Sequence, residues 1–166
     1  MHWTAFPLHP ETPQDGQSLE DLFAGRPINI PEMLAHLRKT ADQLGLPFGD
    51  RRMTFNSRRA QELGKWAEAS DSGDAFHKAA FKAYFAEGLN LAHTPVLLDI
   101  AQSVGLDPDE ARNVIEHQRY GAAVDRDWQR SRTMGITAVP TFVMNDQSLV
   151  GAQTYQDLTR FIHAAT

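Results

Sequence analysis

Apolar residues recur three and four positions apart through most of the chain, the spacing that places side chains on one face of a helix. The pattern runs through residues 18–134, where a proline or a capping residue opens most of the apolar runs and a glycine closes several. The sequence therefore predicts a largely helical middle. The expected helices cover 18–24, 31–44, 56–69, 74–88, 94–105, a helix opening at 107–108, and 122–134.

The pattern is different at both ends of the chain. Residues 2–8 begin with alternating side chains and predict a short strand, followed by a loop rich in proline and glycine over 9–17. Residues 139–144 are β-branched and aromatic, and a two-residue turn separates them from a second short strand at 148–150. These two strands predict a hairpin, and a terminal helix is expected to begin at Thr154.

Composition narrows the class of protein. Apolar residues make up 42% of the 166 residues and charged residues 22%, as in an ordinary globular domain. The formal net charge is -5, which repels phosphate and disfavours nucleic-acid binding. The N-terminus lacks the basic and apolar regions of a signal peptide, and no apolar run is long enough for a membrane helix. The sequence therefore predicts a cytoplasmic protein without nucleic-acid or membrane partners.

Several kinds of catalytic centre lack their usual marks. The chain has no cysteine, which excludes thiolate catalysis, disulfides and zinc sites with cysteine ligands. Its seven histidines form no HxH or HExxH pair, so we expect no metal site. Glycine-rich phosphate loops, dinucleotide fingerprints and GxSxG elbows are also missing, so we expect no cofactor and name no catalytic residue.

An aromatic stripe at helical spacing runs from Phe76 through Phe81 and Tyr84 to Phe85. Such a stripe can line a ligand groove, but at this spacing it more often belongs to the core. We therefore expect the stripe to be packed inside the helical region.

The segment with the most information is GITAVPTFVMNDQSLVGAQ at 135–153. Its Val-Pro-Thr-Phe hairpin resembles the C-terminal part of the DsbA family of thioredoxin-fold oxidoreductases. Four further stretches resemble the FrnE-like branch of that family. They are WTAFPLHPE at 3–11, NSRRA at 56–60, FKAYFAEGLNL at 81–91 and VGLD at 104–107.

The resemblance implies an α/β, thioredoxin-like fold with a large all-α insertion. Residues 1–17 and 135–166 would form a partial thioredoxin-like domain, and 18–134 the helical insertion. It also makes Pro140 the family's cis-proline, with Val139, Pro140 and Thr141 as substrate-binding residues. An ordinary trans proline, or a purely structural turn, is the competing interpretation of this position.

The family places a strand and a Cys-x-x-Cys motif ahead of the segment that resembles residues 2–8. That central N-terminal strand would lie between residues 2–8 and the strand at Thr141. Several unpaired buried backbone groups cost on the order of 10 kcal/mol, comparable with the stability of a whole domain. Three solutions are open: residues 2–8 pair directly with the Thr141 strand, a second copy fills the gap as a homo-oligomer, or an upstream segment exists and the sequence shown is truncated.

Three functions follow as alternatives. The first is a thiol–disulfide oxidoreductase acting on protein or small-molecule disulfides, although this chain cannot be redox-active alone. The second is a non-catalytic peptide- or partner-binding module that uses the backbone beside Pro140. The third is a glutathione-dependent isomerase or transferase of the 2-hydroxychromene-2-carboxylate isomerase type, a group that resembles this chain in its hairpin.

Overall fold

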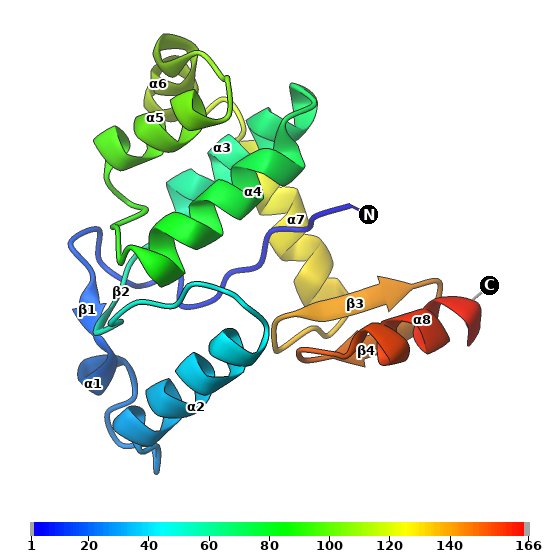
Figure 1. Cartoon of the computed structure of the whole chain (residues 1–166). Coiled ribbons are helices and arrows are strands. Elements are labelled where there is room, and N and C mark those ends of the chain that lie inside the picture. The colour runs from blue at the N-terminus through cyan, green and yellow to red at the C-terminus, as the bar shows by residue number, and fades with distance from the viewer. Residues whose placement is uncertain (1, 165–166) are drawn as a thin grey trace. The chain divides into compact units, whose positions relative to one another are not determined.

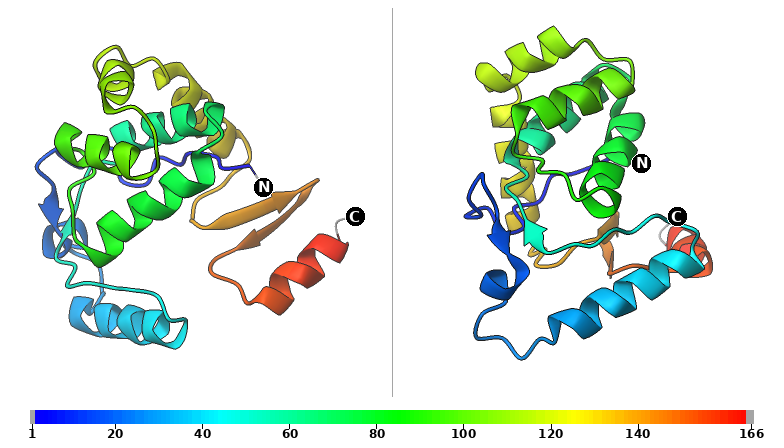
Figure 2. Two further views of the ribbon diagram at one scale, coloured as in Figure 1. Left: turned by 45° about the horizontal axis from the view of Figure 1, so that its top comes forward. Right: turned by 60° about the vertical axis from the view of Figure 1, so that its left-hand side comes forward.

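A computed structural model describes residues 2–164 of the chain (Figure 1). The backbone separates into two compact units, one formed by residues 7–124 and the other by residues 1–6 and 125–166. The predicted division at 17/18 and 134/135 remains a prediction, because compactness of the backbone does not identify an insertion. Figure 2 shows the same elements from two further sides.

The helical unit begins with a small two-stranded ribbon. Strand β1 (Gln17–Ser18) pairs antiparallel with β2 (Met53–Thr54). Between them lie α1 (Leu19–Leu22) and α2 (Ile30–Gln43), which begins with a proline in its first turn. The remaining helices of the unit follow in order: α3 (Arg58–Ala69), α4 (Gly73–Phe81), a π-helical turn η1 (Lys82–Ala86), α5 (Thr94–Ser103) and α6 (Pro108–Glu116). The next helix, α7 (Gly121–Thr133), begins in this unit and continues from residue 125 in the other.

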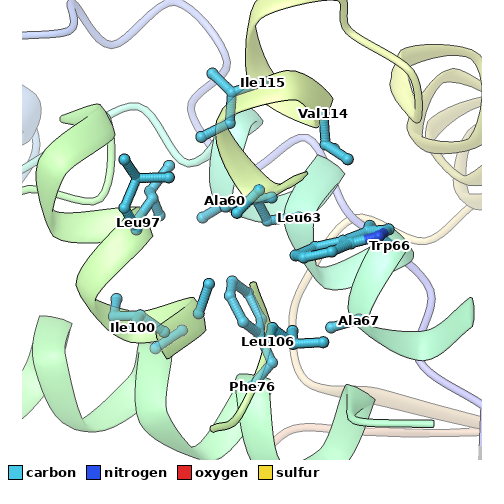
Figure 3. Close-up of a cluster of buried hydrophobic side chains, with 14 of the residues drawn as sticks. Ala60, Leu63, Trp66, Ala67, Phe76, Leu97, Ile100, Leu106, Val114 and Ile115 are labelled. Atoms are coloured by element: carbon cyan, nitrogen blue, oxygen red, sulfur yellow. The ribbon is translucent and has the colours of Figure 1, made fainter. Parts of the chain in front are cut away.

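One hydrophobic core joins α3, α4, α5 and α6. Figure 3 shows Leu63, Trp66 and Phe76 among its side chains, and Leu63 and Phe76 are 0% and 1% exposed. The core also takes in Leu97, Ala101 and Val114, all completely buried. Burial of this apolar surface is the main stabilising contribution of the unit.

The aromatic stripe divides where α4 passes into the π-helical turn. Phe76 is in the core, as predicted, whereas Phe81 is 50% exposed. Tyr84 packs against the core from its edge, and both Tyr84 and Phe85 contact Arg51. The Arg51 guanidinium lies 4.9 Å from the Tyr84 ring centroid and donates to the Tyr84 hydroxyl oxygen at 2.8 Å. The Gly49 amide donates to the Phe85 carbonyl at 2.9 Å, and a Cβ at Gly49 would overlap the Ala86 carbonyl. The loop therefore docks closely on this turn, and the close approach requires glycine at position 49.

The second unit contains the hairpin of β3 (Thr141–Met144) and β4 (Gln147–Val150), followed by α8 (Tyr155–Ala164). At the start of α8 the Thr154 hydroxyl donates to the Asp157 carboxylate at 2.6 Å and accepts from its amide at 3.2 Å. This reciprocal cap lowers the pKa of Asp157, and Arg160 adds to the effect. The predicted start of the last helix is confirmed.

The predicted strand at residues 2–8 is wrong. The segment is irregular, and the Ala5 amide donates to the Asp127 carboxylate on α7 at 2.9 Å. The Ser131 hydroxyl reaches the Ala5 carbonyl at 3.5 Å. An extended segment becomes a strand only when another strand supplies a ladder, and here side chains of α7 take that place. Direct pairing of residues 2–8 with the Thr141 strand is therefore also wrong.

Candidate functional site

The register of the β3–β4 hairpin determines which backbone groups it leaves available. Met144 pairs with Gln147 across a two-residue turn, in which Asn145 has a positive φ of 52°. Pairing continues to Thr141 opposite Val150. One step beyond, the Gly151 amide donates to the Pro140 carbonyl at 2.8 Å. The antiparallel ladder therefore reaches back to Pro140.

Hydrogen-bonded and non-hydrogen-bonded pairs alternate along an antiparallel ladder. Since Pro140 and Gly151 form a bonded pair, Phe142 with Leu149 is the next bonded pair, and Thr141 and Val143 lie between them. The N–H and C=O groups of Thr141 and Val143 consequently point away from β4. Within residues 2–164 no strand pairs with that side of β3. We call this side the open edge.

The three predicted substrate residues lie together at the beginning of the open edge. The Val139–Pro140 peptide bond is cis, and Val139 is 43% exposed. The Thr141 hydroxyl donates to the Ala138 carbonyl at 2.7 Å, which fixes the turn ahead of β3. Their role in binding is a prediction that the geometry alone does not test.

Val143, 39% exposed, belongs to the same edge and was not among the predicted site residues. Its side chain shares a face of β3 with that of Thr141, because side chains two apart in a strand point the same way. A shallow groove lies over this face, bordered by the preceding turn at Ile136 and Ala138. The alternation of side chains along a strand could have placed Val143 on the same face as Thr141. Which of the two sets of backbone groups points away from β4, however, follows only from the register of the paired hairpin.

The open edge offers backbone hydrogen bonds and no reactive side chain. From Gly135 to Asn145 no residue is charged, and the first acid is Asp146 in the turn. In the described part of the chain no three His, Asp or Glu side chains gather as metal ligands would. What this surface can do chemically is accept an extended strand.

A second, polar cleft lies at the start of α3 in the helical unit. Arg58 donates to the Glu62 carboxylate at 2.7 Å and to the Gly121 carbonyl at 2.9 Å, and the Glu62 side chain is only 6% exposed. Arg59 extends toward the Ala92 carbonyl at 3.3 Å. The two arginines thus tie α3 to its neighbours, and the Glu62 carboxylate balances the charge of Arg58.

The helices and the β3–β4 hairpin are those of a thioredoxin-like protein. A model of the DSBA-like thioredoxin domain family matches residues 1–163, and the chain belongs to this family. Because the chain contains no cysteine, its own residues cannot carry out the dithiol exchange that thiol–disulfide oxidoreductases catalyse. None of the helices in residues 2–164 combines the length and apolarity that crossing a membrane requires.

Three known proteins are similar to the chain. The uncharacterized protein YwbO of Bacillus subtilis is 30% identical over 93 residues, which cover 52% of this chain and 44% of YwbO. The match thus spans less than half the length of that relative. The probable DsbA oxidoreductase SCO1869 of Streptomyces coelicolor has a TM-score of 0.85 at 25% identity, covering 94% of this chain and 70% of its own. A 2-hydroxychromene-2-carboxylate isomerase shares the fold, with a TM-score of 0.69 at 18% identity, and the match covers 82% of this chain and 64% of the isomerase.

Proposed function

We propose that this chain is the substrate-docking part of a DsbA-type thiol–disulfide oxidoreductase of the FrnE-like branch. On its own it holds an extended segment of a disulfide or thiol substrate along the open edge beside Val139, Pro140 and Thr141, the side of β3 on which the resemblance places the family's central strand. The reactive sulfurs come from outside this chain, because dithiol exchange needs two of them. Alone, the chain is a non-catalytic peptide-binding module that acts in the cytoplasm.

The observation that carries this proposal is the outward direction of the Thr141 and Val143 backbone groups next to the Pro140 turn. An incoming strand would form a ladder with these groups, and the groove over Thr141 and Val143 would receive its alternate side chains. Backbone recognition suits an oxidoreductase with many protein substrates, because main-chain hydrogen bonds are independent of sequence.

The test is binding of a labelled, carboxymethylated insulin B chain, followed by fluorescence anisotropy. Val143→Pro removes an N–H on the open edge without removing a hydrogen bond to β4, and one net hydrogen bond is worth about 0.5–1.5 kcal/mol. With the added bulk of the ring at the edge, we expect affinity to fall at least about fivefold. Val143→Thr keeps the N–H and the β-branched shape, and its affinity is expected to stay within about twofold.

Equal losses in both variants would assign binding to the side chain and contradict backbone docking. A loss in Ser148→Pro, with Val143→Pro unaffected, would place the probe on the outer edge of β4 and also contradict it. Each variant is compared only after its thermal unfolding and circular dichroism match those of the parent chain.

A glutathione-dependent isomerase is the second candidate, supported by the fold shared with the isomerase. Glutathione at millimolar concentration would then raise the melting temperature of the chain through preferential binding to the folded state. An unchanged melting temperature would dismiss this candidate.

A further inference from the structure

The polar cleft at the start of α3 lies wholly within the helical unit. Its volume of about 370 Å³ is at the small end of the roughly 300–1,000 Å³ typical of ligand sites. Its walls come from the first turn of α3, the start of α5, the end of α6 and the loop at Gln14. The Asn56 side chain donates to the carbonyls of Pro10 at 3.1 Å and Thr12 at 2.8 Å. The Asn90 side chain donates to the Gln14 carbonyl at 2.8 Å, so this loop is held in place and the unit's own packing builds the cleft.

Arg59 lines the cleft with half of its guanidinium unpaired. Nη1 donates to the Ala92 carbonyl at 3.3 Å and to the Thr94 hydroxyl at 3.5 Å. Nε and Nη2, whose N–H bonds point in parallel, donate to no group among residues 2–164. Arg58 differs, because its Nε donates to the Glu62 carboxylate at 2.7 Å. Two parallel N–H groups of an arginine match the two oxygens of a carboxylate, so Arg59 offers the cleft a binding group for an anion.

The cleft also contains an unpaired negative charge. Glu116, the last residue of α6, lines the cleft, and its exposed side chain pairs with no residue in the described part of the chain. Arg59 and Glu116 thus share one small cleft without forming an ion pair with each other. A phosphate group would bring about 1.5–2 negative charges against one unpaired cation, whereas a carboxylate brings one. The cleft is complementary to a ligand with one carboxylate and one cationic group.

We propose that this cleft binds a small zwitterion, an amino acid or a short peptide with free ends. Its carboxylate would lie on Nε and Nη2 of Arg59, and its ammonium group would lie beside Glu116. The amide side chains of Gln14 and Gln118 line the same cleft and can bond the polar groups between the two ends. The ligand is small and one of its ion pairs is exposed, so we expect a Kd of about 0.1–10 mM. This site shares no residue with the open edge and does not depend on the proposed function.

The probes are glycine and glycylglycine, which carry the same two charges at different separations. Binding is followed by NMR, through the shifts of the Arg59 Nε–H and of the backbone amides of α6. The probe that binds more tightly distinguishes a free amino acid from a peptide as the better ligand. Absence of a saturable shift with either probe at about 50 mM, several times the weakest expected Kd, would overturn the proposal.

Two blocked analogues are the matched controls for the probes. Glycine methyl ester lacks the carboxylate and should bind at least about fivefold more weakly than the tighter zwitterion, because it loses charge-assisted hydrogen bonds. N-acetylglycine lacks the ammonium group and should lose about two- to fivefold, the range of an exposed ion pair. An ester that binds as tightly as the zwitterion would overturn the role of Arg59.

Glu116→Gln separates a zwitterion site from simple attraction of an anion. Loss of the exposed carboxylate should weaken binding of the zwitterion by about two- to fivefold and should strengthen binding of N-acetylglycine, since repulsion of the probe's carboxylate disappears. A change in the same direction for both probes, or no change for either, would contradict the proposal.

Arg59→Lys keeps the positive charge and loses the parallel N–H groups, so both carboxylate probes should bind at least about fivefold more weakly. Arg112→Lys is the matched control, because Arg112 is exposed on α6 and does not line the cleft, and affinity should stay within about twofold. Unchanged affinity in Arg59→Lys would contradict the proposed carboxylate contact. Variants are compared once their circular dichroism matches that of the parent chain; if loss of the bond to Ala92 unfolds Arg59→Lys, Glu116→Gln and the blocked probes still decide.

Discussion

Insulin reduction by dithiothreitol is expected to proceed at the same rate with and without this chain. The nucleophile in dithiol exchange is a thiolate, and the chain contains no cysteine at any position. The open edge can hold a substrate strand, but holding alone transfers no electrons. The measurement is the onset of insulin B-chain turbidity over a range of chain concentrations.

A dithiol oxidoreductase with an intact Cys-x-x-Cys motif serves as the positive control and should shorten the onset in proportion to its concentration. The chain should leave the onset unchanged even at tens of micromolar. An onset that shortens as more chain is added would mean that sulfur is not required, and it would contradict the proposal that this chain only docks the substrate while sulfurs from outside it carry out the exchange.

Phe76→Ala is expected to lower the free energy of unfolding by about 3–5 kcal/mol. Phe76 is 1% exposed at the centre of the core built by α3, α4, α5 and α6, so its removal leaves a cavity that the rigid neighbours fill only in part. The measurement is the midpoint of urea unfolding, followed by circular dichroism of the helices.

Phe81→Ala is the matched control, because it removes the same side chain from the last residue of the same helix. Phe81 is 50% exposed, and we expect its loss to cost less than about 1.5 kcal/mol. Similar losses for the two variants would show that α4 is not held by its buried face, and would contradict the core as described.

The helical middle of the chain could be predicted because its helix ends are marked in the sequence. Pro95 lies in the first turn of α5, and Asp107 accepts hydrogen bonds from the amides of Asp109 and Glu110 at the start of α6. These signals act within one turn of the chain, so they need no knowledge of the fold.

The prediction failed where a distant partner decides the structure. Residues 2–8 contact side chains of α7 more than a hundred positions away. Gln17, predicted in a loop, pairs with Thr54 in a ribbon of two residues a side. In the π-helical turn at Lys82–Ala86, the Phe85 carbonyl accepts a hydrogen bond from the Gly49 amide, and nothing in the sequence near either residue indicates this contact. Each outcome depends on a long-range contact that propensity does not contain.

The candidate site could be predicted only in part, because its local features are marked in the sequence and its strand register is not. Turn residues and β-branched runs identified the hairpin, and the resemblance pointed to Val139, Pro140 and Thr141. The outward direction of Val143 required the register, which a shift of one residue would have reversed.

The most direct test of the open edge is amide hydrogen exchange along β3, measured by NMR in a dilute sample. Without probe, the amides of Thr141 and Val143 should exchange at least about tenfold faster than those of Phe142 and Met144, which donate to β4. A saturating amount of carboxymethylated insulin B chain should protect Thr141 and Val143 and leave Ser148 and Val150 unchanged. Protection that appears on β4 alone, or nowhere in the hairpin, would contradict docking at this edge.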